Sequence, residues 1–280
     1  MPTFFIAGAP KAGTDLLYYQ LDKHPEIYMS PLKEPNFFAE EIRPENFDPS
    51  IKKHALRLIE RTRTDLDAGT TVKRFGGIVC ELSDYEKLFA GVRSETAIGE
   101  ASVSYLWSRS APTAIARLIP DAKIIAVLMN PAERAFHQYL KSLADEDVTH
   151  SFSTHLDLAF EDLSNSQTQL RLFNPFLAFG KYADQVERYL ENFSREQLLI
   201  SLYEDPEADY QRWFAKVLDF LGVRSDFVPV PVEVHSTSKF GDRPVPQLGQ
   251  EERARLVNFY RDDVRHLQDL IGRDLSAWLQ

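Results

Sequence analysis

The N-terminal stretch limits the folds open to this chain more than any other segment. Residues 3–7 (Thr-Phe-Phe-Ile-Ala) carry no charge and are rich in aromatic and β-branched side chains, which is typical of a short buried strand. Residues 8–13 contain glycine at both ends and a proline between them, which predicts a tight loop. From Thr14 the apolar spacing becomes helical. We therefore expect a strand, a loop and a helix N-terminus in direct succession, the unit from which parallel α/β sheets are built.

The same succession predicts an anion-binding site. The first backbone N–H groups of a helix lack intrahelical partners, and the helix dipole adds partial positive charge at the same end. Lys11 adds a full positive charge inside the loop. The Walker A form needs a lysine directly after the second glycine, where this chain has Thr14. The loop favours a phosphate ligand, and an ordinary strand-to-helix turn with a solvated lysine is the alternative.

The composition sets further limits. With 280 residues, 44% of them hydrophobic, the chain can bury a full core, and we expect one domain over residues 1–280. A net charge of −10 argues against broad nucleic-acid binding. The single cysteine, Cys80, excludes an internal disulfide, and the sequence has neither a signal-peptide pattern nor an apolar run of about 18 residues. We therefore expect a cytoplasmic protein without a membrane span.

The rest of the chain continues an α/β pattern. Residues 123–128 are the clearest buried strand, and residues 96–106 and 197–205 predict two more. Helical spacing recurs between and after them, at residues 111–118, 132–143, 179–190, 213–221 and 251–271. We expect a central parallel sheet of about four or five strands with helices on both faces, in which ligands bind at the carboxyl ends of the strands.

A second candidate segment covers residues 30–38 (Ser-Pro-Leu-Lys-Glu-Pro-Asn-Phe-Phe). Its two prolines predict an irregular loop, and Phe37 and Phe38 would pack that loop on the core. Lys33 and Glu34 lie between the prolines. A charged pair held in a fixed loop over an apolar floor suits a general base, because partial desolvation makes a carboxylate more basic. A solvated Lys–Glu pair on the surface is the alternative.

Both segments resemble motifs of the sulfotransferases that use 3′-phosphoadenosine 5′-phosphosulfate (PAPS). Residues 10–14 (Pro-Lys-Ala-Gly-Thr) are similar to the family's Pro-Lys-Ser/Thr-Gly-Thr loop, and residues 33–38 to the Lys-Glu-Pro-His-Phe-Phe segment of its carbohydrate and bacterial branches. The resemblance implies a three-layer α/β fold of P-loop-kinase type. It also implies transfer of a sulfuryl group from PAPS to a hydroxyl or amine, with 3′-phosphoadenosine 5′-phosphate (PAP) as product and no metal.

The resemblance assigns two catalytic roles. Lys11 would stabilise charge on the leaving phosphate oxygen, and Glu34 would remove the acceptor proton. The 5′-phosphosulfate would be held by the loop and the first helical turn, with the N–H groups from residue 12 to residue 16 as donors. That set is Pro10, Lys11, Ala12, Gly13, Thr14, Asp15 and Leu16. Asp15 stands where relatives have threonine or serine, so it adds a negative charge beside the phosphate.

Acceptor contacts are implied on two segments. Residues 99–105 (Gly-Glu-Ala-Ser-Val-Ser-Tyr) resemble a family stretch that lines the acceptor cleft, and Asn36 stands where relatives often have histidine. The implied acceptor residues are Lys33, Asn36, Glu100, Ser102 and Tyr105. A structural hydrogen-bond acceptor at a strand end is an equally good interpretation of Glu100. The acceptor can be a small molecule, a glycan or a lipid, and the sequence does not decide between them.

The segment expected to hold the 3′-phosphate departs from the family. Residues 128–139 resemble a Leu-Arg-Asn/Asp-Pro-x-Glu-Arg-Ala-x-Ser-x-Tyr motif in which Arg134 matches, but Met129 replaces the first arginine and His137 the serine. Losing an arginine–phosphate contact would weaken donor binding by roughly one to two orders of magnitude. A histidine can compensate as a neutral donor or as a cation. A late loop would close over the 3′-phosphate and adenine, through Lys239, Phe240, Gly241, Asp242 and Arg243.

Two other functions remain open from the sequence. One is a sulfotransferase-like protein that binds a nucleotide without turnover, which Met129, His137 and Asp15 together favour. The other is a small-molecule P-loop kinase, which would need a lysine after Gly13 and a strand-end aspartate for magnesium; Thr14 denies the first of these. The sequence does not indicate an oligomeric state.

Overall fold

A five-stranded, wholly parallel sheet with the order β2-β5-β1-β6-β7 forms the centre of the protein. The structure is a computed structural model that describes residues 1–69, 73–164, 176–229, 240 and 244–280. The strands of the sheet are β1 (Phe4–Gly8), β2 (Ile27–Met29), β5 (Ala97–Ala101), β6 (Lys123–Leu128) and β7 (Leu198–Leu202). The prediction of an α/β fold with a central parallel sheet is confirmed.

Strand β1 can lie in the middle of the sheet because it has no polar or charged side chain. All five of its residues are buried, and it pairs in parallel with β5 on one side and β6 on the other. The register sets Ile6 opposite Ala101 and Ile125. The carboxyl ends of β5, β1 and β6 therefore meet at one edge of the sheet, where a parallel α/β fold places its ligands.

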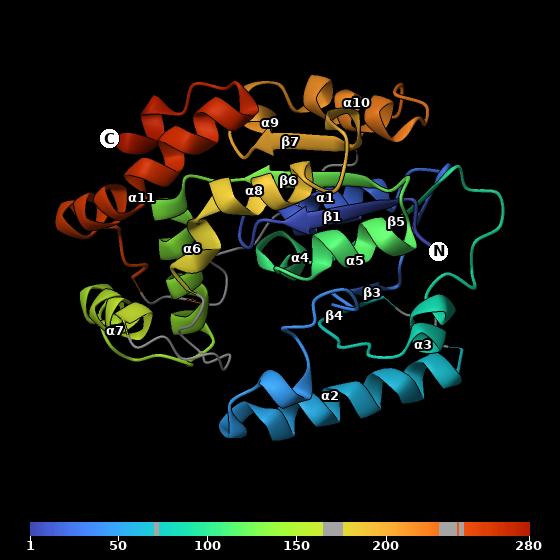
Figure 1. Ribbon diagram of the computed structural model, residues 1–280, viewed down its shortest axis with the longest axis horizontal. Helices are drawn as coiled ribbons and strands as arrows, with labels where there is room; N and C mark the ends of the chain where they lie inside the picture. Colours follow the sequence, from blue (N-terminus) through green and yellow to red (C-terminus); the bar gives the residue numbers. More distant parts are fainter. Residues whose placement is uncertain (70–72, 165–175, 230–239, 241–243) are drawn as a thin grey trace.

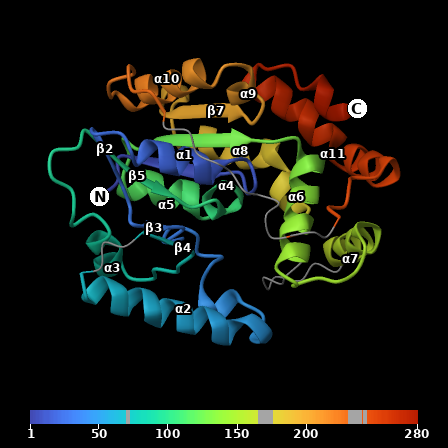
Figure 2. The same ribbon diagram turned by 180° about the vertical axis from the view of Figure 1, so that it is seen from behind.

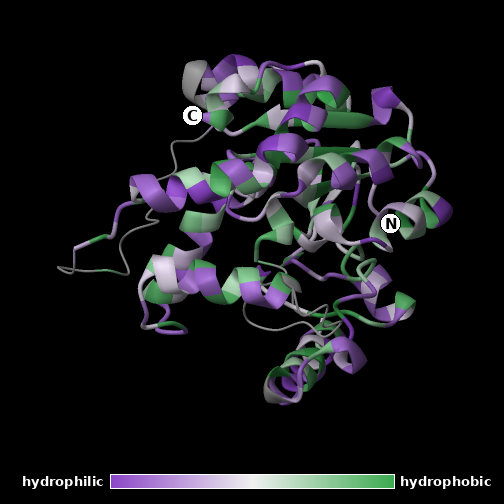
Figure 3. Cartoon of the chain, turned by 60° about the vertical axis from the view of Figure 1, so that its left-hand side comes forward, coloured by the Kyte–Doolittle hydropathy of each residue, from purple (hydrophilic) through white to green (hydrophobic). Residues whose placement is uncertain are grey.

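Helices cover both faces of this sheet (Figures 1 and 2). Helices α4, α5 and α8 lie in front of it in Figure 1, and α1 lies in front in the opposite view of Figure 2. The bounds of the helices are α1 (Thr14–Leu21), α2 (Pro49–Asp67), α3 (Leu82–Lys87), α4 (Ser104–Trp107), α5 (Ala111–Leu118), α6 (Pro131–Ala144), α7 (Phe152–Ser164), α8 (Tyr182–Leu190), α9 (Asp205–Ala208), α10 (Tyr210–Leu221) and α11 (Gln250–Ile271). Figure 3 shows the apolar residues gathered on the strands and on the helix surfaces that face them.

A smaller subassembly lies below the sheet in Figure 1. Strands β3 (Leu32–Lys33) and β4 (Arg74–Phe75) form a two-stranded parallel ribbon, with the long helix α2 beyond it. The ribbon corrects the prediction that residues 30–38 form an irregular loop throughout. Lys33 accepts a backbone hydrogen bond from Gly76 at 2.9 Å, so part of this segment is held as a strand by a partner far away in the sequence.

The structure also corrects two element boundaries. Helix α8 begins at Tyr182 after a 3-10 turn, whereas the sequence predicts a helix from residue 179. The strand predicted over residues 96–106 ends at Ala101, and the short helix α4 follows it. Among the helices in the described ranges, none has the length and apolar character needed to span a membrane.

Candidate active site

The loop between β1 and α1 lies at the carboxyl edge of the sheet. The Ala9 N–H donates to the Val127 carbonyl at 2.7 Å, which ties the start of the loop to the end of β6. Lys11 (φ 71°) and Gly13 (φ 80°) both adopt left-handed backbone conformations, and these turn the chain back into the helix. Left-handed backbone suits glycine but is strained for lysine. We infer that the constrained backbone at Lys11 limits the directions in which its side chain can point.

The first turn of α1 offers N–H groups to a ligand. The first intrahelical hydrogen bond runs from the Leu17 N–H to the Gly13 carbonyl at 3.2 Å. The N–H groups of Thr14, Asp15 and Leu16 precede that bond and have no partner in the helix. Ala12 differs from the prediction, because its N–H already donates to the Ala9 carbonyl at 3.2 Å. Ala12 is therefore not available as a donor, in contrast to the prediction from the sequence.

The ammonium group of Lys11 lies in a mixed electrostatic environment. Its pKa is lowered from the ordinary lysine value, first because neighbouring protein displaces water around it. The negative charges of Asp15 and Glu34 oppose this shift, whereas the positive charges of Lys33 and Arg134 add to it. Two predicted site segments, the phosphate loop and the Glu34 loop, thus lie within electrostatic reach of one lysine.

Lys33 joins these two segments. Its side chain is 1% exposed, and its ammonium lies 2.7 Å from the Asp15 carboxylate and 3.3 Å from that of Glu34. Burial alone would lower the pKa of Lys33, but Glu34 and Asp15 outweigh it and raise the pKa above the ordinary value. The ammonium is thus paired inside the protein, and the expected contact of Lys33 with an acceptor stays a prediction. The sequence identified Lys33 but did not pair it with Asp15.

Glu34 combines a fixed backbone with an accessible side chain. Its φ is 69°, its N–H donates to the Ala101 carbonyl at 2.8 Å, and its carbonyl accepts from Gly77 at 3.1 Å. The side chain is 30% exposed, in contrast to its buried neighbour Lys33. The carboxylate is therefore anchored beside the end of β5 and reachable from solvent, as a general base must be.

A buried network of hydrogen bonds supports the Glu34 loop. Glu100 is wholly buried and accepts hydrogen bonds from Tyr85 at 2.6 Å, Ser102 at 2.6 Å and Tyr105 at 3.1 Å. The pKa of Glu100 is raised to about 7: burial is the largest cause, the charge of Glu34 also raises the pKa, and the three hydroxyl donors lower it. Ser102 in turn accepts the Asn36 N–H at 3.1 Å.

The predicted acceptor residues Asn36, Glu100, Ser102 and Tyr105 all lie in or beside this network. The last three side chains are 0% exposed and hydrogen-bonded to one another, and Asn36 is 8% exposed. The Asn36 amide donates to the carbonyls of Glu34 at 2.8 Å and Gly77 at 2.9 Å. These residues hold the loop in place, and their contact with an acceptor stays a prediction. The structural interpretation of Glu100, left open by the sequence, describes its position.

The segment after β6 offers less to a phosphate than the sequence predicts. Met129 is 3% exposed. Arg134 is 0% exposed and donates to the Phe176 carbonyl at 2.6 Å and to Gln138 at 2.5 Å. Its guanidinium joins α6 to the chain before α8, and its contact with a nucleotide stays a prediction. His137 differs from both, since it is exposed.

The His137 ring lies within electrostatic reach of the phosphate loop. Its pKa is lowered from the ordinary histidine value, first by displacement of water around the ring. The charge of Glu133 opposes the shift and that of Lys11 adds to it. Of the late loop, Lys239, Gly241, Asp242 and Arg243 lie outside the described residues, and Phe240 is 5% exposed.

Tyr203 is a site residue that the sequence analysis missed. Its N–H donates to the Leu128 carbonyl at 2.7 Å, at the end of β6. Its ring lies against the phosphate loop, since a Cβ on Gly13 would come within 3.5 Å of the Tyr203 ring. The only sequence signal is an aromatic residue directly after a strand, which is too common to indicate a site.

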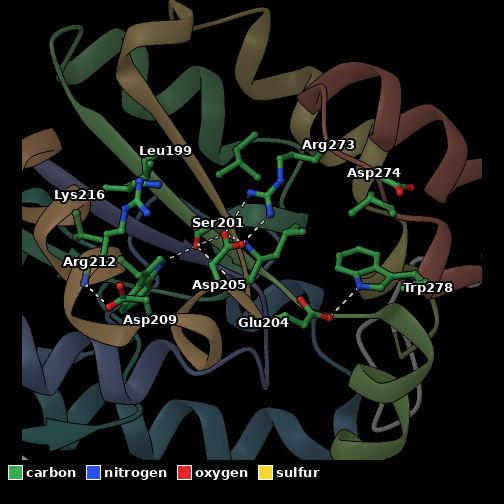
Figure 4. Close-up of a pocket in the computed structure, with 16 residues that line it drawn as sticks. Leu199, Ser201, Glu204, Asp205, Asp209, Arg212, Lys216, Arg273, Asp274 and Trp278 are labelled. Carbon is green, nitrogen blue, oxygen red and sulfur yellow. Dashed lines mark hydrogen bonds and ion pairs between the residues drawn. The ribbon is translucent and has the colours of Figure 1, made fainter.

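A cavity of about 610 Å³ lies elsewhere, against the edge strand β7 (Figure 4). Its walls come from β7, α10 and the C-terminal residues. Arg273 pairs with Asp205 at 2.7 Å across it, and Trp278 donates to Glu204 at 2.9 Å. None of the predicted site residues in the described part of the chain lines this cavity. Nor do the described residues contain three or more His, Cys, Asp or Glu side chains grouped to hold a metal ion.

Comparison with known proteins identifies the family. The sequence pattern of the sulfotransferase family matches residues 2–226, most of the chain. This chain belongs to the sulfotransferase family. A crystal structure of a sulfotransferase from Alicyclobacillus acidocaldarius is 35% identical, with a TM-score of 0.79 over 100% of this chain and 99% of that one. The predicted family, fold and sulfuryl-transferring type of enzyme are confirmed at this level.

More distant sulfotransferases extend the comparison. The chain is 28% identical to the bifunctional heparan sulfate N-deacetylase/N-sulfotransferase 4 of Mus musculus, covering 100% of this chain and 31% of that protein. It is 25% identical to carbohydrate sulfotransferase 15 of Rattus norvegicus, covering 99% of this chain and 54% of that protein. The chain thus spans 31% and 54% of the length of these two relatives. A sulfotransferase domain from the curacin biosynthetic pathway, at 15% identity and a TM-score of 0.51, shares the fold.

Proposed function

We propose that this protein transfers a sulfuryl group from PAPS to a hydroxyl or amine of a glycan or related acceptor. The observation that carries the proposal is that the N-terminus of α1 and the Glu34 carboxylate meet at one ammonium. Lys33 contacts Asp15 and Glu34 together, so these two carboxylates are at most about 6 Å apart. A phosphate-binding loop next to an accessible base suits the transfer of a group from a bound donor to an acceptor, because both reactants are held close together.

The residues fit the 5′ end of the donor. The N–H groups of Thr14, Asp15 and Leu16 precede the first hydrogen bond within α1, and Lys11 adds positive charge. When bound, PAPS supplies an activated sulfuryl group whose sulfur is attacked by the acceptor oxygen or nitrogen. Glu34 takes the acceptor proton as the new bond to sulfur forms. Lys11 stabilises the negative charge left on the phosphate oxygen as the old bond breaks.

Met129 and Arg134 give weak support for a site that binds the 3′-phosphate. Met129 carries no charge, and Arg134 is committed to Phe176 and Gln138. We therefore assign the 3′-phosphate to His137 together with Lys239 and Arg243. A nucleotide-binding protein without turnover is the second candidate, and the uncharged Met129 in place of the family arginine favours it.

Glycan acceptors are proposed on the basis of the relatives. The mouse and rat proteins are named for heparan sulfate and for carbohydrate. An amine and a hydroxyl differ in how easily they lose a proton, but both need a base within hydrogen-bond reach. Glu34 can serve either one.

Calorimetric titration with PAP, adenosine 5′-phosphate and ATP tests the donor. We expect micromolar PAP affinity, weaker binding of the other two nucleotides, and a loss of PAP affinity in Lys239→Ala and Arg243→Ala. Equal affinity for PAP and adenosine 5′-phosphate would remove the 3′-phosphate site and overturn the proposal.

Transfer from radiolabelled PAPS to an N-desulfated glycosaminoglycan and to a neutral glycan tests the reaction. Glu34→Gln should lower turnover by about 10²–10⁴-fold with PAP affinity largely kept. PAP binding without transfer to either acceptor would favour the second candidate.

A further inference from the structure

The phosphate loop carries a charge that opposes its proposed ligand. Asp15 is the second residue of α1, at the end where an anion should bind, and its side chain is 69% exposed. A carboxylate there lies within a few Å of the proposed phosphate, and like charges at such separations repel by one to several kcal/mol depending on screening. Such a site needs a nearby cation to bind its donor well.

Lys33 is placed to supply that cation. Its ammonium is 2.7 Å from the Asp15 carboxylate, although Lys33 itself is 1% exposed. Its backbone is fixed in β3, paired in register with Phe75 of β4, and its ammonium lies 5.7 Å from the centre of the Phe75 ring. A lysine held this way cannot swing out to solvent without breaking the packing of the ribbon. Its charge is therefore a permanent part of the phosphate loop.

The same ammonium also holds the proposed base. Lys33 contacts the Glu34 carboxylate at 3.3 Å, and the Glu34 backbone is fixed by hydrogen bonds with Ala101 and Gly77. The cluster consists of two positive and two negative side chains: Lys11, Lys33, Asp15 and Glu34. The charges of the other three side chains all affect the pKa of Lys11. Loss of the Lys33 charge therefore affects both the donor side and the base side of the site.

We propose that Lys33 is a positioning residue that neutralises Asp15 for donor binding and orients Glu34 for proton removal. The proposal rests on the proposed function. Asp15 and Lys33 then act as a matched pair: Asp15 is tolerated at the phosphate site because Lys33 is buried against it. Lys33 does not touch the donor or the acceptor.

A double-mutant cycle tests the pair. Lys33→Met should weaken PAP binding about tenfold, because Asp15 and Glu34 lose their shared cation beside the anionic ligand. Asp15→Asn should change PAP affinity by less than about twofold, because Lys33 already neutralises Asp15 in the parent. The double variant Asp15→Asn/Lys33→Met should return to within about threefold of the parent, because both charges of the pair are gone. Effects of the two single changes that multiply in the double variant would overturn the proposal.

Measuring kcat shows whether Lys33 orients Glu34 or only balances the charge of Asp15. The double variant should regain PAP affinity but keep a kcat at least about tenfold below the parent, because Glu34 is no longer held by Lys33. Lys33→Arg should keep most of both quantities. Full recovery of kcat in the double variant would remove the role in orienting Glu34.

Lys73→Met is the matched control. Lys73 forms an ion pair with Asp22 at the other end of α1, so the change removes a similar pair from the same helix. PAP affinity should stay within about twofold of the parent, since Asp22 lies beyond the last turn of α1. A tenfold loss of PAP affinity in this variant would mean that any lysine near α1 has the effect.

The parent protein separates the two proposals. Failure of the parent to bind PAP would overturn the proposed function whatever the variants do. In that case, urea unfolding tests the interaction between Asp15 and Lys33. The proteins compared are the parent, the two single variants and the double variant. Asp15→Asn should lower the urea midpoint in the parent but not in Lys33→Met. An equal decrease in both backgrounds would mean that the two side chains do not act together.

Discussion

The hydroxyl of Ser102 lies 2.6 Å from the carboxylate of Glu100 in a part of the core where neither side chain reaches solvent. The same hydroxyl accepts the Asn36 N–H, two residues after Glu34. The geometry of the proposed base is thus set by a buried carboxyl group. Four experimental predictions follow from this and from neighbouring contacts.

Glu100 should make the stability of the protein depend on pH. Its pKa is raised from 4.5 to about 7, so the folded protein keeps a proton that the unfolded chain has lost. The contribution of Glu100 to stability is therefore greatest below about pH 4.5 and falls as the pH rises to about 7. Between pH 5 and pH 8 the loss should be about 1–3 kcal/mol.

Urea unfolding of the parent and of Glu100→Gln at both pH values measures this effect. The glutamine variant should lose less stability over this range than the parent. Equal pH dependence in the two proteins would show that Glu100 does not titrate there.

Lys11 should be required for turnover, and its protonation should limit the rate at high pH. Lys11→Ala removes the charge proposed to stabilise the leaving oxygen, and we expect a loss in kcat of at least about a hundredfold. Because the pKa of Lys11 is lowered, the parent should lose activity at a pH below that of an ordinary lysine. A kcat profile measured to pH 10.5 checks this, with Lys216→Ala in α10 as a control that keeps normal activity. Near-normal turnover in Lys11→Ala would rule out the assigned role.

Arg134 should matter more for stability than for nucleotide affinity. Arg134→Met removes buried hydrogen bonds to Phe176 and Gln138, at a cost of about 2–4 kcal/mol in the free energy of unfolding. Arg117→Met on the exposed face of α5 should cost less than about 0.5 kcal/mol. PAP affinity, measured below the unfolding transition, should change by less than about threefold. A large loss of PAP affinity at normal stability would support the predicted phosphate contact.

His137 should make PAP binding tighter in acid. Its lowered pKa leaves the ring neutral near pH 7, and protonation would add a positive charge near the proposed 3′-phosphate. The parent should bind PAP about three- to tenfold more tightly at pH 5.5 than at pH 7.5, after correction for protonation of PAP itself. His137→Gln supplies that correction, because it keeps a neutral donor and should lack the extra gain. An equal increase in PAP affinity in both proteins would mean that protonation of PAP, and not of His137, causes the pH dependence.

The sequence was most informative where chemistry and local structure coincide. Residues 123–128 could be recognised as a strand because five consecutive apolar residues suit only a position buried on both faces. The phosphate loop could be recognised because glycines, a lysine and the start of a helix lie within a few consecutive residues. Glu34 stood out because its neighbours, two prolines and two phenylalanines, predict a fixed loop over a core.

The sequence was least informative where residues far apart in the chain meet. Nothing near Lys33 indicates that β4, over 40 residues later, would bury it, or that Asp15 on α1 would be its partner. Glu100, Ser102 and Tyr105 matched a motif, but burial turned them inward toward Tyr85 and Asn36. Arg134 likewise matched a motif, and its contact with Phe176 made it part of the core.

The sequence by itself therefore determined the α/β class, the phosphate loop and the identity of the charged side chains, because these depend on patterns within a few residues. Only the tertiary structure decided which of those side chains are available to a ligand. Availability depends on burial and on partners, and both are set when distant segments pack together. Lys11 and Glu34 stay accessible at the carboxyl edge of the sheet, while Lys33 and Glu100, adjacent to them in space, are enclosed.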